Sequence, residues 1–591
     1  MMYKSVLSRI SAGLILLLLI SCDLGQEKSN VAIQIDQAFA TWAEGNNKLI
    51  EYYRPGFASE LYQARREMPS VSPENILEGY DRALLALQQI QSIDTTSLNP
   101  YEKLEWIGLR DFLHIQAEGK EFAFYESLIN PIDGIHFSLF QDLGYGFTME
   151  EKDDCDRMIT RARTYPKLID DLKAYLNACN RAKTLPPKAL LIEVKKQADS
   201  LLATPVLKHP LYRGLARQLG NADPILINER EATSYLIKMD GVLQDYVYPP
   251  YKELVNMLDV LIDNAEDDIS VNRWSNGQKF YEYQLKKYLG HEVELTALHE
   301  EALQEFDELK NQFAMEGLAP SEKLLPASSR FKARNASLDS ARALSRRMRR
   351  DSQGLMDSIP QTKLYILEMP DWAGDYTPTH AYYPPAMDGS RRGIMLIDMT
   401  HPEYHGIFSQ RVQLYQFGNP GMHYFVSSNF DRKSNSDFSK YVNFEGNVMG
   451  WKVMVADQVY QSLGLLQERK TSKAEYEQQK ILSLGRLIID TGIHLEGWSR
   501  EQAISFLIKE IGLSERLAKL ETDRAIVYPG RPASEWLGYR ELQKLKNGYR
   551  RIKDKNFQLQ DFHNMVMMTS SSPFRQTFRR LKELTGESLA N

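Results

Sequence analysis

The amino-acid sequence predicts a mainly α-helical fold, and two observations support that class. Apolar residues recur at intervals of three and four through most of the chain, which is the period of one helix face. No segment alternates apolar and polar residues densely enough for a sandwich or barrel, and we identify no internal repeat. The 591 residues, 43% hydrophobic and 25% charged, have a globular balance and a length that favours two or more lobes.

Prolines and apolar spacing predict the bounds of the helices. Pro73 and Pro100 stand where a proline in a first helical turn is tolerated, whereas Pro249-Pro250 is expected to separate two helices. The predicted helices cover residues 38–53, 73–90, 100–118, 153–163, 166–182, 193–202, 228–246, 250–262 and 282–315. Residues 120–151 are expected to form interior loops, residues 320–361 a solvated basic helix, and the chain after residue 408 further helices.

A small β element is expected around residues 364–400. Residues 365–367 and 394–397 are short apolar runs bounded by turn residues, which is typical of a pair of short strands. Tyr382-Tyr383-Pro384 and Asp388-Gly389 lie between the two runs.

The N-terminus predicts a lipoprotein signal peptide over residues 1–21. Lys4 and Arg9 precede an apolar run, 14–20, that is too short to span a bilayer as a mature helix. The run ends Leu19-Ile20-Ser21-Cys22, which resembles a bacterial lipobox; a plain signal peptide with an incidental cysteine is the alternative. Lipidated Cys22 would anchor the chain to a membrane through a polar tether, 22–32, on the periplasmic side of the bacterial cell envelope.

The rest of the chain, 33–591, is expected to be one large helical domain with lobes of about 33–360 and 361–591. Its net charge of −6 shows no basic footprint, so nucleic acid is not an expected partner. Its 31 tyrosines fit either an aromatic-lined cleft or a large core. Cys155 and Cys179 could pair in an oxidising compartment or remain separate buried thiols, and the sequence leaves both readings open.

Several blocks resemble, in order, a bacterial family of zinc-peptidase-like lipoproteins known as domain of unknown function 885. Residues 414–424 read Leu-Tyr-Gln-Phe-Gly-Asn-Pro-Gly-Met-His-Tyr, where the family reads His-Glu-x-x-Pro-Gly-His-His. The other matching blocks are Tyr382-Tyr383-Pro384, Gly450-Trp451, Leu463-Gly464-Leu465, residues 486–494, residues 497–503, Asp523-Arg524 and Tyr528-Pro529-Gly530. The resemblance implies a large fold similar to helical metallopeptidases, with long helices around a deep channel.

The same resemblance implies that zinc-dependent hydrolysis has been lost. Gln416 and Phe417 stand where the family has its metal ligand and general base, and Met449 stands where it has a further glutamate ligand. Met422 replaces one histidine of the second pair, which leaves His423 alone. A phenyl ring cannot accept a proton, and a thioether is a poor ligand for zinc. No catalytic residue and no metal cofactor are therefore assigned.

Two substitutes for the lost site remain open. Glu445-Gly446 could replace the missing glutamate by a shifted register, although Gly446 favours a loop there. His401 and His405, spaced as i and i+4, could join His423 in a relocated zinc site; surface histidines are the simpler interpretation. His291-Glu292 and His299-Glu300 lack a second histidine at the required spacing and are expected to lie on a surface helix face.

Seven residues are candidates to face a ligand in the channel, by the same resemblance. They are Arg486, Asp490, His494, Arg524, Tyr528, Arg531 and Glu535. The two family arginines, Arg486 and Arg524, could clamp a peptide carboxylate or pair with Asp490 and Asp523. His494 could donate to a ligand carbonyl or hold a Thr491-Gly492 turn, and Arg531 suggests an anionic ligand.

The leading hypothesis is therefore a non-catalytic envelope lipoprotein that binds a peptide or cell-wall-derived ligand. Most of the retained family residues, among them Gly492, Pro529, Gly530 and Gly538, set backbone shape rather than chemistry. The alternatives are a metallopeptidase with the relocated zinc site and a structural or interaction lipoprotein. The oligomeric state, and whether a partner supplies catalytic groups, stay open.

Overall fold

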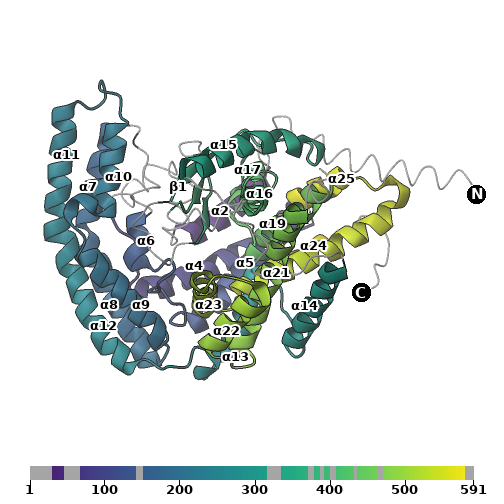
Figure 1. Ribbon diagram of the computed structural model, residues 1–591, viewed down its shortest axis with the longest axis horizontal. Helices are drawn as coiled ribbons and strands as arrows, with labels where there is room; N and C mark the ends of the chain where they lie inside the picture. Colours follow the sequence, from purple (N-terminus) through teal and green to yellow (C-terminus); the bar gives the residue numbers. More distant parts are fainter. Residues whose placement is uncertain are drawn as a thin grey trace, which may run out of the picture.

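The computed structural model of the chain describes residues 29–44, 67–96, 98–141, 149, 151–315, 334–369, 378–385, 392–399, 407–431, 436–462, 470–570, 572–574 and 576–578. Cys22, His401 and His405 lie outside these residues, as does the expected signal peptide. The described chain is mainly α-helical with one small sheet, which confirms the predicted fold class (Figure 1). No helix in this described part is long and apolar enough to cross a membrane.

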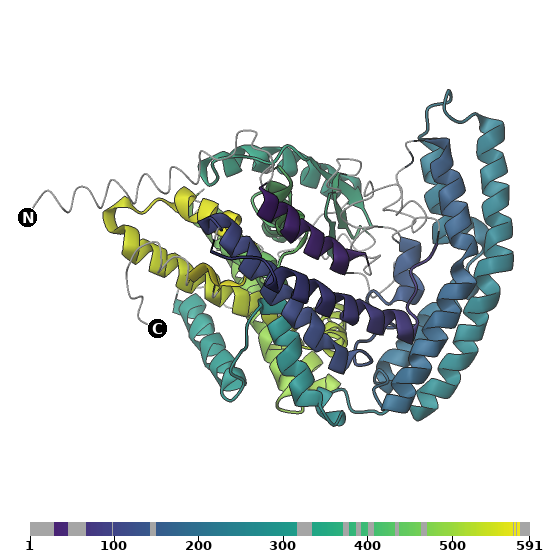
Figure 2. The ribbon, with the colours of Figure 1, turned by 180° about the vertical axis from the view of Figure 1, so that it is seen from behind.

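Three N-terminal helices lie together on the face that Figure 2 turns to the viewer. They are α2 (Asn30–Ala43), α4 (Pro73–Gln91) and α5 (Pro100–Glu118). The hydroxyl of Ser72 accepts from Asn75 N and Pro73 fills the first position of α4, so this helix begins where the sequence predicted. Trp42 of α2 packs edge-on against Phe112 of α5, with ring centroids 4.8 Å apart.

A second group of helices has a core of its own. It comprises α6 (Ile135–Gln141), α7 (Lys152–Arg163), α8 (Tyr165–Ala182), α9 (Lys188–Leu202), α10 (Pro210–Gly220), α11 (Glu229–Val242) and α12 (Tyr248–Asn264). Cys155 and Cys179 are both buried free thiols in this core. Their sulfurs contact Met149 Sδ at 3.2 Å and the carbonyl of Phe124 at 3.5 Å, so the structure has two separate thiols. Burial raises their pKa values to about 11 and about 12.

The predicted break at Pro249-Pro250 is wrong. α11 continues through a π-helical turn, Leu243–Val247, directly into α12, so Figure 1 shows one long rod at the left edge. Both prolines lie in the first turn of α12, where the missing N–H groups interrupt few hydrogen bonds. The wider turn accommodates them without ending the helix.

The predicted helix 282–315 is instead two helices, α13 (Gly277–Leu289) and α14 (Leu298–Met315). α13 ends at Gly290, whose φ of +76° lies in the left-handed region that favours glycine. The prediction that His299 lies on a surface face is also wrong. Its ring is buried, with Nδ1 2.8 Å from the hydroxyl of Thr491.

The expected strand pair is present, with a third strand beside it. The sheet contains β1 (Leu364–Glu368), β2 (His380–Tyr383) and β3 (Gly393–Ile397) in the order β1-β3-β2. β1 pairs with β3 in parallel and β2 pairs with β3 antiparallel. β3 is buried along its length, which agrees with its unbroken apolar run, whereas half-buried β2 offered too short a pattern to predict.

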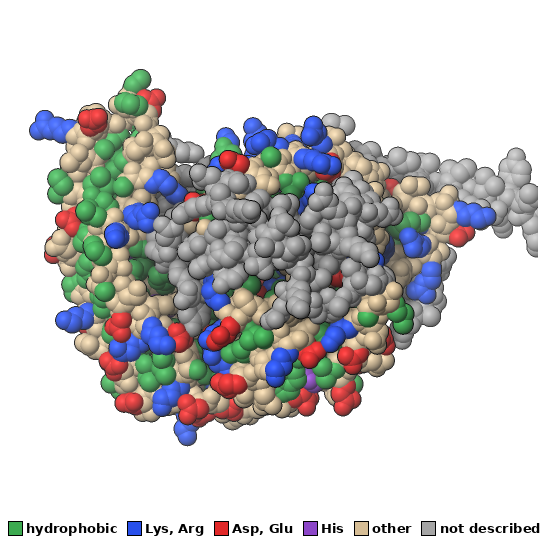
Figure 3. All heavy atoms as spheres, viewed as in Figure 1, with side chains coloured by type: hydrophobic (Ala, Val, Ile, Leu, Met, Phe, Trp, Pro, Cys, Tyr) green, Lys and Arg blue, Asp and Glu red, His purple; other side chains and the backbone are tan. Residues whose placement is uncertain are grey.

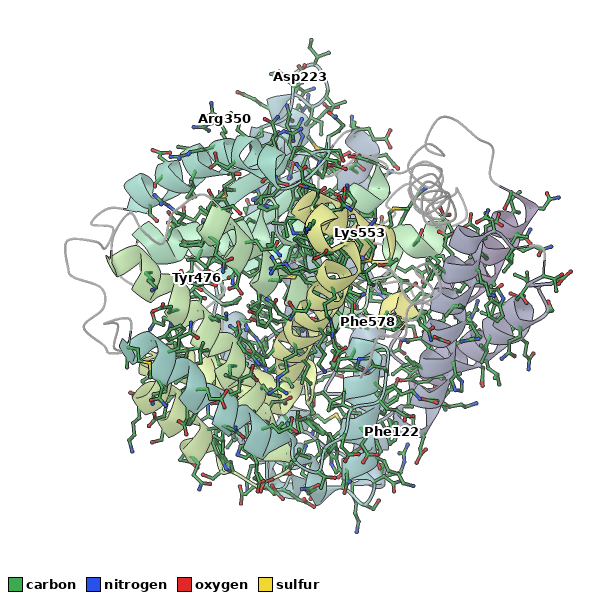
Figure 4. All side chains as sticks on the ribbon, turned by 90° about the vertical axis from the view of Figure 1, so that its right-hand side faces the viewer. Phe122, Asp223, Arg350, Tyr476, Lys553 and Phe578 are labelled. Atoms are coloured by element: carbon green, nitrogen blue, oxygen red, sulfur yellow. The ribbon has the colours of Figure 1, made fainter. Side chains whose placement is uncertain are left out.

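The basic segment forms α15 (Arg334–Asp351), which packs beside β1. Ala341 and Met348 face the core, while Arg346, Arg347 and Arg350 are exposed. Lys and Arg side chains gather over this helix along the upper edge of Figure 3, and Arg350 is labelled there in Figure 4. The helix is therefore amphipathic, solvated on one face only.

The remaining helices share the largest core with α13 and α14, except α18, whose Phe438 packs in the core of the three N-terminal helices. They are α16 (Ile407–Phe417), α17 (Met422–Phe430), α18 (Asp437–Tyr441), α19 (Glu445–Ser462), α21 (Lys470–His494), α22 (Arg500–Phe506), α23 (Glu515–Val527), α24 (Arg531–Lys553) and α25 (Leu559–Met568). Figure 4 labels Tyr476 on α21 and Lys553 at the end of α24. Short 3₁₀ turns and a second π turn complete the described elements: Gly119–Phe122, Val206–Lys208, Val271–Arg273, Ser352–Gly354, Asp554–Asn556 and, the π turn, Leu507–Ile511.

α19 and α24 cross in direct backbone contact. A Cβ on Gly538 would lie 2.0 Å from the carbonyl oxygen of Gly446, and a Cβ on Gly450 would lie 2.3 Å from the carbonyl carbon of Gly538. Gly446 is thus in the first turn of a helix rather than in the loop that its sequence favoured. This close crossing aligns one face of α19 with one face of α24 and so positions the site.

Candidate functional site

His423 is a packed, neutral histidine in this fold. It lies in the first turn of α17 and is fully buried. Its Nε2 lies 3.1 Å from the carbonyl of Thr362 and therefore carries the proton, so Nδ1 accepts from the hydroxyls of Tyr382 at 3.2 Å and Ser427 at 3.3 Å. Burial lowers its pKa to about 4. The one lone pair of the ring is already engaged.

The other positions that the resemblance assigned to a metal site lie near Lys452 or on the adjoining helices. Gln416 is buried and Met422 is half-buried, while the ring of Phe417 lies 5.3 Å from the ammonium nitrogen of Lys452. Met449 is half-buried one turn before Lys452 on α19. Within the described residues, no group of three or more His, Cys, Asp or Glu side chains could hold a metal ion.

Lys452 belongs to a buried ionic cluster of five side chains: Lys452, Arg486, Glu521, Arg524 and Glu535. Glu535 accepts from Lys452 at 2.9 Å and from Arg486 at 3.1 Å, and it also accepts from the hydroxyl of Ser483. Arg486 makes a second, bidentate pair with Glu521, at 2.9 Å and 2.8 Å. Helices α19, α21, α23 and α24 thus meet at one set of charges.

Both carboxylates of the cluster are ionised. Burial opposes their charge, but the neighbouring cations hold the pKa values of Glu521 and Glu535 at about 2. Burial also lowers the pKa of the Lys452 ammonium, against the attraction of Glu535. Arg486 therefore pairs with glutamates, not with the aspartates that the sequence suggested. Asp523 is bonded by Arg500 instead, at 2.7 Å.

Asp490 and His494 are fully buried supports of the backbone. Asp490 accepts from the hydroxyl of Tyr281 at 3.1 Å and from Gly530 N at 3.0 Å, and burial raises its pKa to about 8. His494 Nδ1 accepts from Val271 N at 3.3 Å, while Nε2 donates to the carbonyl of Ala525 at 3.0 Å. Burial lowers its pKa to about 3. In this conformation neither ring nitrogen is available to a ligand.

Thr491-Gly492 is not a turn, because α21 continues through it to His494. Gly492 instead allows close packing of Trp498, whose ring would lie 2.6 Å from a Cβ at that position. Gly530 is the position that needs a left-handed backbone, with a φ of +81° just before α24.

Tyr528 and Arg531 lie outside the ionic cluster. They belong to a second set of polar side chains, with Glu445, Asp133, Lys287, Glu126, Tyr80 and Tyr288, which we call the polar seam. Arg531 Nε donates to Glu445 Oε1 at 2.6 Å, and its guanidinium lies 5.0 Å from the ring centroid of Tyr528. The hydroxyl of Tyr528 hydrogen-bonds to Asp133, from the segment before α6. The Arg531 side chain keeps 36% of its surface exposed, and its terminal nitrogens have no hydrogen-bond partner among the described residues.

The far side of the polar seam carries two tyrosines and another ion pair. Lys287 of α13 pairs with Glu126, and both lie close to half-buried Tyr288 and Tyr80. Burial raises the pKa of each tyrosine, so both hydroxyls are protonated donors at neutral pH. Neither hydroxyl has a hydrogen-bond partner in the described part of the chain.

The polar seam and the ionic cluster lie along the same two helix faces. Glu445, Met449 and Lys452 are spaced as i, i+4 and i+7 on α19, and Arg531 and Glu535 as i and i+4 on α24. Glu445 pairs with Arg531 and Lys452 with Glu535 across the crossing. Phe417 and Met449, two positions that the resemblance assigned to the site, therefore lie at or beside this line.

Sequence reasoning did not single out five of these residues: Tyr80, Glu126, Lys287, Lys452 and Glu521. Only Lys452 had a local signal, because it directly follows Gly450-Trp451. The others reach the site from segments far apart in the chain.

The chain is thus a large helical protein with one small mixed sheet and a buried line of charges, and both its sequence and its fold have relatives. The chain belongs to the family described as "Bacterial protein of unknown function (DUF885)", which matches residues 55–576. No curated protein matches it.

Two of the solved structures that share this fold are described as lipoproteins. One is named "putative lipoprotein" from Colwellia psychrerythraea; it is 18% identical, with a TM-score of 0.86 over 94% of this chain and 99% of that one. The other is a "putative lipoprotein of unknown function" from Shewanella oneidensis; it is 14% identical, with a TM-score of 0.67 over 94% and 100% of the two chains.

Proposed function

We propose that this protein is an envelope lipoprotein that binds a peptide or cell-wall-derived ligand and does not hydrolyse it at zinc. The observation that carries this proposal is the set of unpartnered donors in the polar seam. The terminal nitrogens of Arg531 and the hydroxyls of Tyr80 and Tyr288 are half-buried, yet they have no hydrogen-bond partner in the described part of the chain. Partly exposed donors without a protein partner bond to water or to a ligand, so these groups are available to hydrogen-bond a bound ligand.

The chemistry of the polar seam suits a ligand of this class. Its charges are mostly paired internally, Lys287 with Glu126 and Arg531 with Glu445. What remains for a ligand is aromatic surface, two tyrosine hydroxyls and the terminal N–H groups of Arg531, whose charge Glu445 balances. These groups match peptide carbonyls and sugar hydroxyls.

Two observations support the absence of zinc hydrolysis. His423 has no lone pair to offer a metal, which also counts against the relocated site with His401 and His405. The Lys452 ammonium lies beside Phe417, the position where the family has its general base. A fixed positive charge there repels a divalent cation.

The lipobox-like Leu19-Ile20-Ser21-Cys22 supports an envelope location. So does the similarity to two proteins named as putative lipoproteins. We propose that the chain is anchored through Cys22 on the periplasmic side.

A structural or interaction lipoprotein is the second candidate. Asp490 and His494, which the resemblance placed towards a ligand, are instead packed within the core. If that packing extends along the polar seam in solution, no ligand will enter.

The test is binding of a muropeptide mixture to the soluble chain that begins after Cys22, followed by native mass spectrometry. We expect a retained ligand mass in the wild type and its loss in Arg531→Gln and in Tyr80→Phe/Tyr288→Phe. Arg550→Gln, a change of the same kind at an exposed position of α24, is the matched control and should keep the ligand. No ligand mass in the wild type would favour the structural candidate.

A further inference from the structure

The buried ionic cluster carries one more positive charge than negative charge. Lys452, Arg486 and Arg524 are its cations, and Glu521 and Glu535 are its anions. The ion pairs of these five side chains all fall within the cluster. A net charge away from water is costly unless a counter-ion joins it.

Arg524 is the open member of the cluster. Its Nη1 is shared between the two oxygens of Glu521, each at 3.3 Å, which is a weak geometry for an arginine pair. Its Nε and Nη2 have no partner among the described residues, and 23% of the side chain is exposed. An arginine in this state can offer two parallel N–H groups to another anion.

Lys452, at the opposite end of the cluster from Arg524, is also incompletely paired. Its side chain is 6% exposed, it has one hydrogen bond, to Glu535, and it contacts the ring of Phe417. Burial lowers the pKa of its ammonium, and nearby Arg486, which shares Glu535 with it, lowers that pKa further.

We propose that this cluster is a carboxylate subsite, in which the free carboxylate of a bound peptide pairs with Arg524 and neutralises the cluster. The proposal rests on the ligand-binding function proposed above and names the end of the ligand that is recognised. A carboxylate carries the one negative charge that the cluster lacks. A phosphate dianion would overcompensate it, so a monoanion fits better.

The helix geometry sets the length of the ligand. Lys452 follows Glu445 by seven residues on α19, a rise of about 10 Å, which equals about three residues of extended peptide. Half-buried Met449 and Phe417 lie along or beside this line between the polar seam and the cluster. A peptide with its amides at Arg531 would thus need about three residues to bring its carboxylate level with Lys452, where the cluster begins.

The experiment compares trialanine with trialanine C-terminal amide, by isothermal titration of the soluble chain that begins after Cys22. We expect the wild type to bind the acid at least tenfold more tightly than the amide. Arg524→Gln should bring the ratio close to one, Arg524→Lys should keep part of it, and the surface control Arg550→Gln should keep all of it. Equal binding of acid and amide by the wild type would overturn the subsite but leave ligand binding intact.

Failure of both peptides to bind would overturn the peptide-binding function, and a second arm then decides the subsite alone. Thermal unfolding is measured in sodium acetate and in sodium chloride at equal ionic strength and pH. A rise in Tm with acetate in the wild type that is absent in Arg524→Gln supports the subsite. The same response in both proteins, or none in either, overturns it.

Discussion

Removing an anion from the buried ionic cluster should lower the free energy of unfolding, whereas removing a cation should leave it unchanged or raise it. Glu535→Gln removes the carboxylate that accepts from Lys452 at 2.9 Å and from Arg486 at 3.1 Å. Three cations would then share one carboxylate, Glu521. Removing one partner of a buried pair costs about 3–5 kcal/mol, so we expect the free energy of unfolding to fall by that amount.

Lys452→Met should have little effect or the opposite effect. The ammonium is 6% exposed, and its loss makes the cluster neutral while Glu535 keeps Arg486 and Ser483. A methionine of similar length can pack against Phe417. Replacing buried ions by apolar groups is often neutral or stabilising, so we expect a change between zero and a gain of about 2 kcal/mol.

Urea unfolding followed by tryptophan fluorescence is the assay. Trp451 and Trp536 are 0% and 2% exposed and are next in sequence to Lys452 and Glu535, so their emission reports on this region directly. The double variant, Lys452→Met/Glu535→Gln, restores the original net charge and should recover part of the loss. If Lys452→Met alone destabilises the protein as much as Glu535→Gln, the cluster has no excess positive charge and the reasoning fails.

Three further predictions concern the helix crossing, a buried carboxyl and metal content. Gly538→Ala places a Cβ 2.0 Å from a backbone oxygen of α19 and should cost about 3 kcal/mol or more by thermal unfolding. Gly79→Ala, with nothing within 4 Å, is the control and should gain up to about 1 kcal/mol. Because burial raises the Asp490 pKa to about 8, its neutral form stabilises the fold at low pH. That contribution declines as pH rises from the unfolded value, about 4, to about 8. Wild type should therefore lose stability relative to Asp490→Asn from about pH 4 to about pH 8 and level off above that; parallel pH curves would contradict the assignment. Finally, protein dialysed after incubation with zinc should retain no stoichiometric metal by elemental analysis. One zinc per chain, lost in His401→Ala/His423→Ala, would establish the relocated site instead.

Local signals in the sequence were sufficient for many of the helices. The predicted helix 100–118 has the bounds of α5, and 73–90 differs from α4 by one residue. Both depend on a proline in the first turn and on apolar spacing, which act within a few residues of each other. The chemistry of Gln416, Phe417 and Met449 was likewise readable directly, because the donors and acceptors of a side chain need no knowledge of the fold.

Continuity of the helices depended on more than these local signals. Pro249-Pro250 looked like a break, yet a π turn carries the chain through it. Gly290 was hidden inside an apolar pattern that looked continuous, although its left-handed backbone ends α13. In both places the outcome depended on backbone conformation. The π turn puts both prolines in a first helical turn, and Gly290 adopts the left-handed conformation at little cost.

The partners of the charged residues were decided by tertiary structure alone. From sequence, Arg486 could pair with Asp490 or Asp523, but its partners are Glu521 and Glu535, 35 and 49 residues away. Those pairs form where α21 packs against both α23 and α24. The sequence thus determined many of the helices and the side-chain chemistry available at each position. The fold decided which charges meet, because ion pairing depends on distances across helices that no local pattern encodes.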